Sequence, residues 1–135
     1  MSALGKDRMT PERPGGLVTL GVKADTKIYL GALVVNDAGD AAPGTAATGL
    51  VSIGVAQGTV DNSGGSAGDK SVDIKRGVFR LNNSGSDAVT AAEIGKDCYI
   101  EDDHTVAKTD GTGTLSRAGK VFDLDSSGVW VDTRN

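Results

Sequence analysis

The last third of the chain, residues 95–132, consists of short runs of alternating apolar and polar residues separated by Asp, Gly and Ser. Residues 115–124 and 129–132 are two such runs, and Asp125-Ser126-Ser127-Gly128 between them has the length and chemistry of a hairpin turn. Alternation with a period of two places apolar side chains on one face of a strand. This pattern favours short antiparallel strands, and we expect a compact β module.

Composition supports many short strands joined by tight turns. The chain has 135 residues, which is most simply one domain. Of its 18 acidic residues, 15 are Asp and 3 are Glu, and 20 residues are Gly. Asp and Gly form turns, whereas Glu favours helices. The apolar residues suffice for one small core.

Charge and cysteine content limit the function classes. A net charge of −4 argues against nucleic-acid binding, which usually needs a basic surface. A single cysteine excludes an internal disulfide and a cysteine-based metal site. Apolar runs stay well below the ~18 residues of a membrane span. The first residues lack the apolar stretch of a signal peptide, so we expect the protein to be made in a cytoplasm and to act without a membrane.

The strand-like runs are separated by turn-forming sequence. Residues 36–40 predict a turn, residues 41–49 and 61–69 predict loops, and Gly77 predicts a bulge in its run. Thr90 and Glu93 fit a capping box, although Gly95 limits the helix to about one turn. The predicted strands are residues 17–22, 27–35, 50–60, 70–81, 98–100, 105–107, 115–124 and 129–132. This order predicts an all-β fold, a small antiparallel β-sandwich or barrel.

Residues 1–16 lack a periodic apolar pattern and contain two prolines and five charged residues. We expect an extended N-terminal arm there and a single β domain over residues 17–135. An arm of this kind is suited to becoming ordered on a neighbouring subunit. The basic residues Lys6, Arg8 and Arg13 are therefore candidate partner-binding residues.

Lys75 and Arg76, together with Arg80, form a small basic patch, although a solvated surface is the simpler explanation. Arg76 and Arg80 are further candidates for partner contact. They share a face if Gly77 does not shift the strand register. The five aromatic residues are scattered over different runs, so we expect them in the core rather than in a stacking platform. Trp130 is the largest apolar side chain of the predicted final hairpin.

Catalytic or metal chemistry has few candidates. His104 follows Asp102 and Asp103, a set that could bind a metal or act as an acid–base group, but a solvated turn explains it more simply. Cys98 alternates with polar neighbours and is expected to be a buried structural side chain. We assign no catalytic residue, metal or cofactor. A peptidase that uses Ser116 and Lys120 is a distant alternative.

An ordered series of short motifs resembles the capsid cement, or decoration, proteins of tailed phages. The similarity covers roughly residues 17–133. The motifs are Gly-Ala-Leu-Val at 31–34, Ile-Gly-Val-Ala at 53–56, Gly-Asp-Lys-Ser-Val-Asp-Ile at 68–74, Gly-Val-Phe at 77–79, Ile-Gly-Lys-Asp-Cys-Tyr-Ile at 94–100, Ala-Gly-Lys-Val at 118–121 and Gly-Val-Trp-Val at 128–131.

The resemblance implies a small β protein on the outer surface of the head. Such a protein would contact neighbouring major capsid protein subunits, form dimers or trimers, and have no catalytic residues. From another class, a glycan- or receptor-binding β module of a virion fibre remains the alternative. The resemblance does not extend to residues 1–16.

Overall fold

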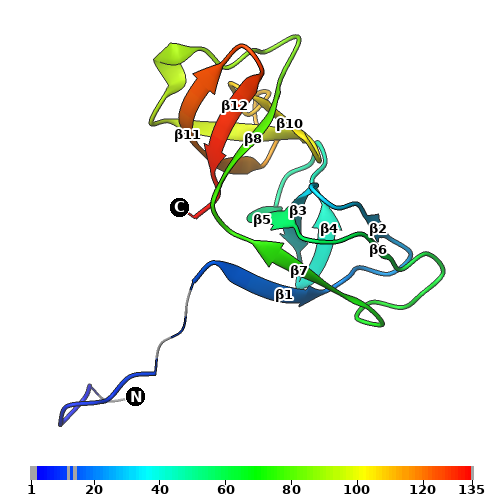
Figure 1. The fold of residues 1–135 in the computed structure, drawn as a ribbon, viewed down its shortest axis with the longest axis vertical. Helices are drawn as coiled ribbons and strands as arrows, with labels where there is room; N and C mark the ends of the chain where they lie inside the picture. The colour runs from blue at the N-terminus through cyan, green and yellow to red at the C-terminus, as the bar shows by residue number, and fades with distance from the viewer. Residues whose placement is uncertain (1–2, 12, 14, 135) are drawn as a thin grey trace.

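The computed structural model describes residues 3–11, 13 and 15–134. Its regular structure is β-strand apart from one short 3-10 helix, which confirms the predicted all-β fold. Figure 1 shows two bodies that follow one another along the chain. The first half of the chain forms a five-stranded sheet with a small two-stranded sheet, and the second half forms a closed five-stranded barrel.

The five-stranded sheet has the order β1-β7-β5-β3-β4 and curls around a core of its own. Val22 forms a parallel bridge with Ala41, which brings the two ends of the sheet together. Ile28 from the small sheet is completely buried in this core. The strands are β1 (Leu17–Gly21), β3 (Leu33–Asp37), β4 (Asp40–Pro43), β5 (Val51–Ala56) and β7 (Ser71–Lys75), with β2 (Lys27–Ile28) and β6 (Val60–Asp61) in the small sheet.

The barrel has the order β10-β8-β12-β11-β9 and closes through the pairing of β9 with β10. Asp125 faces Gly128 at the turn between β11 and β12, so the predicted final hairpin is confirmed. Gly119 allows β11 to approach β12 closely, because a Cβ there would overlap the Asp132 carbonyl. The strands are β8 (Val78–Asn83), β9 (Asp97–Asp102), β10 (Thr105–Ala107), β11 (Arg117–Asp125) and β12 (Gly128–Asp132).

The predicted capping box is confirmed at the 3-10 helix η1 (Ala91–Glu93). The Thr90 hydroxyl accepts from the Ala92 amide at 3.3 Å, and the Glu93 carboxylate accepts from the Thr90 amide at 2.7 Å. These bonds satisfy amides at the start of the turn. They hold η1 beside the barrel, where the Gly95 amide donates to the Val121 carbonyl at 2.8 Å.

A second core cluster joins the two bodies. Leu33, Val35 and Ala42 of the sheet pack in one buried cluster with barrel residues that include Ile100 and Val131. Backbone bonds reinforce the contact, since the Leu33 amide donates to the Asp103 carbonyl at 2.7 Å. The sheet and the barrel are therefore packed against each other rather than linked only by the chain.

Three predicted strands were too long, because each is divided in two. The run 27–35 is interrupted by a turn at Gly31, whose φ is +87°, and the run 50–60 is divided into β5 and β6. In the run 70–81, Gly77 is the crossover from the sheet to the barrel and not a bulge. A crossover and a bulge both need a residue that interrupts strand alternation, so the local sequence does not separate them.

The predicted loops were also partly wrong. Residues 40–43 form β4, after the predicted turn in which Ala38 and Gly39 both have positive φ. Ala41 and Ala42 are small because they are buried between packed elements. In the loop 61–69, Asn62 is 2% exposed, and its amide donates to the carbonyls of Val22, Lys23 and Ser66.

The prediction that the aromatic residues form the core is wrong. Tyr29 and Phe122 are 57% and 60% exposed, and Phe79, Tyr99 and Trp130 are only half-buried. Both cores are filled mainly by Val, Ile, Leu and Ala. β-branched side chains pack well inside small, strongly curved sheets. The aromatic rings are left on the outer surfaces.

Candidate partner-binding site

The N-terminal arm projects away from both bodies (Figure 1). Its last residue, Gly16, accepts a hydrogen bond from the Arg76 amide at 2.8 Å, and β1 begins at Leu17. Leu4 and Met9 are 75% and 97% exposed. Exposed apolar side chains contribute favourable free energy to binding when a partner surface removes them from water. Residues 1, 2, 12 and 14 of the predicted arm lie outside the described residues.

The three basic candidates of the arm, Lys6, Arg8 and Arg13, are all exposed. Arg8 donates to the Thr10 hydroxyl at 3.0 Å, a contact within the arm itself. Their charged groups are therefore presented to solvent or to a partner. A surface that meets them has to supply carboxylates or carbonyl oxygens.

Arg76 lies at the crossover, and Arg80 lies on β8 of the barrel. Arg76 donates to the Arg134 carbonyl at 3.2 Å. The guanidinium of Arg80 lies 5.9 Å from the centre of the Trp130 ring, a cation–π distance. Both side chains thus have intramolecular contacts, and their shared face stays a prediction.

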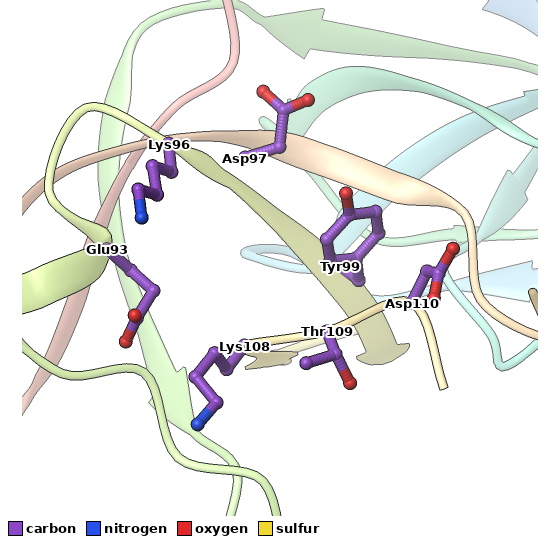
Figure 2. Close-up of a pocket in the computed structure, with 7 residues that line it drawn as sticks. All are labelled: Glu93, Lys96, Asp97, Tyr99, Lys108, Thr109 and Asp110. Carbon is purple, nitrogen blue, oxygen red and sulfur yellow. The ribbon is translucent and has the colours of Figure 1, made fainter. Parts of the chain in front are cut away.

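A shallow pocket of about 570 Å³ lies on the barrel surface between η1, β9 and the segment that follows β10. In Figure 2 the ammonium groups of Lys96 and Lys108 lie on one side, with the Glu93 carboxylate between them. The Tyr99 ring and the Asp110 carboxylate lie on the other side. Asp97 and Thr109 complete the lining.

Three lining residues are held by internal contacts. The Asp97 carboxylate is 2.8 Å from Arg117 Nε and 3.6 Å from Lys120 Nζ. The hydrogen bond that Arg117 donates lowers the pKa of the Asp97 carboxyl group. Hydrogen bonds from Thr90 lower the pKa of Glu93, with smaller contributions from the Lys108 and Lys96 charges. The Thr109 hydroxyl donates to Asp87 at 2.6 Å. These groups stay ionised or bonded and give the pocket a fixed frame.

The other four polar groups are open to a ligand. Within the described part of the chain, the ammonium groups of Lys96 and Lys108, the Asp110 carboxylate and the Tyr99 hydroxyl form no hydrogen bond or ion pair. The pocket therefore offers two cations, one anion and one aromatic ring to a molecule outside the fold. A ligand with both signs of charge matches this set better than a simple anion does.

Sequence reasoning missed this pocket. The sequence does indicate part of the pocket, because alternation along β9 places Asp97 and Tyr99 on the face opposite the buried Cys98 and Ile100. The register of the β9–β10 pair, in which Ala107 faces Tyr99, brings Lys108 beside them. That register follows from the tight turn at residues 102–105, and an irregularity between Thr105 and Val106 makes it hard to derive from sequence.

His104 lies in the exposed turn between β9 and β10, as predicted. Its Nδ1 is 2.8 Å from Asp103 Oδ1 and 3.1 Å from Asp102 Oδ1, and the bond to Asp103 raises its pKa. The ligand atoms of these three residues lie within 4.8 Å of one another. Asp102 also accepts from the His104 amide, a common contact in turns, so the turn itself holds these three side chains together.

Cys98 is completely buried, which confirms its predicted structural position. Burial raises the pKa of its thiol to about 12, so the reactive thiolate is scarce at neutral pH.

The structure does not bring Ser116 and Lys120 into a catalytic pair. The Ser116 hydroxyl donates to the Ala47 carbonyl at 2.7 Å and accepts from the Leu50 amide at 3.1 Å. Lys120 is directed instead toward Asp97. A nucleophile must have its base within hydrogen-bond reach. The Ser116 hydroxyl serves to fasten residues 47–50 to the barrel.

Comparison with protein-family models, curated proteins and solved structures found no match. Among the described residues, none of the helical structure is long and apolar enough to cross a membrane.

Proposed function

We propose that this protein is a decoration protein that binds the outer surface of a tailed-phage head and stabilises contacts between major capsid protein subunits. The motif series gives the first support. The second is the projecting arm, which carries Lys6, Arg8 and Arg13 in exposed positions and leaves Leu4 and Met9 uncovered. This arm is the single observation that carries the proposal, because it presents exposed charged and apolar side chains outside a packed β body.

The arrangement suits attachment to a repeating surface. The sheet and barrel share a core and act as a compact body, while the arm supplies main-chain groups and charges to a neighbouring subunit. Each contact is small, but contacts to several capsid subunits and to neighbouring copies reinforce one another through effective concentration. The protein would bind as a dimer or trimer, without nucleic acid, cofactor or enzymatic chemistry.

Co-sedimentation with phage heads tests the proposal. The purified protein should sediment with mature heads that lack it and should not sediment with unexpanded precursors, whose subunit spacing differs. Head stability against heat or chelators should rise as sites fill. Equal binding to precursor and mature heads, or binding to tails alone, contradicts the proposal.

The hairpin end of the barrel favours a second candidate, a glycan-binding module of a virion fibre. A polar pocket of about 360 Å³ there is lined by amide, carboxylate and hydroxyl side chains, the groups that bind sugars. They include Asn82, Asp125 and Ser127. Asp125 already accepts from Ser127, Gly128 and Trp130, which leaves it little capacity for a ligand. Binding to a glycan array, lost on Asn82→Ala, would favour this function over capsid decoration.

A further inference from the structure

We propose that the N-terminal arm of one copy docks into the pocket around Tyr99, Lys96 and Lys108 on a second copy of this chain. This inference deepens the proposed function by naming a partner for the arm, but its test needs no phage head. The arm would thus be a contact between decoration subunits.

The mixture of charges on both surfaces favours this occupant. The arm has three of the fourteen basic residues but only two of the eighteen acidic residues, so it is net positive on a chain of net charge −4. Three of the seven residues that line the pocket are acidic and two are lysines, so the lining, like the arm, carries both signs of charge. Complementary charge speeds association and sets register.

The order of charges along the arm also matches the pocket. Asp7 lies between Lys6 and Arg8, and neighbouring residues of an extended chain point in opposite directions. Asp7 can therefore meet the two lysines, whose ammonium groups flank the Glu93 carboxylate but form no hydrogen bond or ion pair within the described residues. Arg8 can then reach the Asp110 carboxylate and the face of the Tyr99 ring.

Geometry favours a second copy over the arm's own body. In Figure 1 the arm leaves at the lower end of the molecule, whereas the helix η1 beside the pocket lies at the upper end. From residue 3 to residue 16 an extended chain spans about 45 Å. A compact body of this size has a radius of gyration of about 14 Å, so the arm can reach across a neighbour's surface. Such a head-to-tail contact can close a ring of copies.

Disulfide trapping in mixtures of two full-length variants tests the inference. One variant has Met9→Cys in the arm, and the other has Ile94→Cys, an exposed position beside Glu93 and Lys96 that removes no charge. The control partner has Ala67→Cys, an exposed position in the loop 61–69 of the sheet body. Native Cys98 stays in all variants because it is buried.

At a few hundred micromolar with a mild oxidant, Met9→Cys should form the mixed disulfide with Ile94→Cys at least tenfold faster than with Ala67→Cys. Equal rates would overturn the inference. A third variant carries both Met9→Cys and Ile94→Cys in one chain. If this variant forms an internal disulfide while the mixture of single variants stays monomeric, the inference is also overturned. In that case the arm lies on its own body.

Charge reversal identifies the contacts. Lys96→Glu with Lys108→Glu in the pocket copy should slow trapping at least tenfold, and Asp7→Lys in the arm copy should restore it. Lys27→Glu with Lys75→Glu, the same change in net charge on the sheet body, should leave the rate unchanged. If both pairs slow trapping equally, or if Asp7→Lys restores nothing, the pocket is not the site. Loss of head binding with trapping intact would instead contradict only the proposed function.

Discussion

Thr133 and Gly77 are joined by three hydrogen bonds. The Thr133 hydroxyl accepts from the Gly77 amide at 3.0 Å and donates to the Gly77 carbonyl at 2.9 Å, and the Thr133 amide donates to the same carbonyl at 2.8 Å. Gly77 lies where the chain passes from the sheet to the barrel, and Thr133 directly follows the last strand. The end of the chain therefore fixes the crossover between the two bodies.

Thr133→Val should destabilise the protein by about 1–3 kcal/mol, because it leaves the Gly77 amide without this partner at a position where Thr133 is only 3% exposed. Urea unfolding followed by circular dichroism measures the loss. The matched control is Thr19→Val, which removes an exposed hydrogen bond to Asp73 and should change stability by less than about 0.5 kcal/mol. Equal effects of the two changes would show that the crossover contact is not important.

Trp130→Ala should cost less than Ile100→Ala, although Trp is the larger side chain. Ile100 is completely buried in the cluster shared by both bodies, and its truncation should cost about 2–5 kcal/mol. Trp130 is half-buried, and its indole N–H donates to Asp125 at 2.8 Å on the barrel surface, so about 1–3 kcal/mol is expected. The opposite order in denaturant unfolding would place Trp130 in the core.

The final hairpin illustrates what the sequence could and could not predict. Alternation along 129–131 correctly places Val129 and Val131 on one face and Trp130 on the other. The size of Trp130 misled the prediction of which face is buried, since a narrow barrel has room for Val but not for an indole. Strand order is a longer-range property, because the crossover at Gly77 depends on contacts with Thr133 fifty-six residues later.

The candidate site was predictable in one part only. The arm follows from the absence of an apolar period in residues 1–16, which is a local property. The pocket requires the register between β9 and β10, because that register places Lys108 beside Tyr99. Arg80 and Trp130 are likewise partners only because β8 pairs with β12. Composition does not encode such pairings.

Cys98 should react with a thiol reagent only after the protein unfolds. Its side chain is completely buried, and burial raises the pKa of the thiol to about 12. A colorimetric disulfide reagent at pH 8 should modify one thiol per chain in denaturant and react much more slowly with the native protein. Because Cys98 is the single cysteine, the count needs no correction. Rapid native labelling would mean that the barrel opens readily around β9.

His104 should make stability fall slightly as pH rises past neutrality. Its hydrogen bond to Asp103 raises its pKa above the ordinary 6.5, so the folded state holds the proton more tightly than the unfolded state does. The contribution is fully present below the unfolded pKa and is lost as pH rises through the folded pKa. The effect is small because the imidazole is exposed. Tm measured between pH 5 and 9 should show this slope, and His104→Gln should remove it; an unchanged slope would assign it to another group.

Deletion of residues 1–14 should separate folding from binding. The described part of the arm lies outside both core clusters, and its backbone contact with the body is at Gly16, which the truncation keeps. Tm should therefore stay nearly unchanged. Head occupancy should fall at least tenfold, equivalent to about 1.4 kcal/mol, because the exposed Leu4, Met9 and Arg8 are lost. A variant with residues 1–14 scrambled preserves length and net charge and should bind as poorly as the truncation. Undiminished occupancy by the truncated protein, measured by quantitative gel analysis of sedimented heads, would show that the body alone provides the attachment.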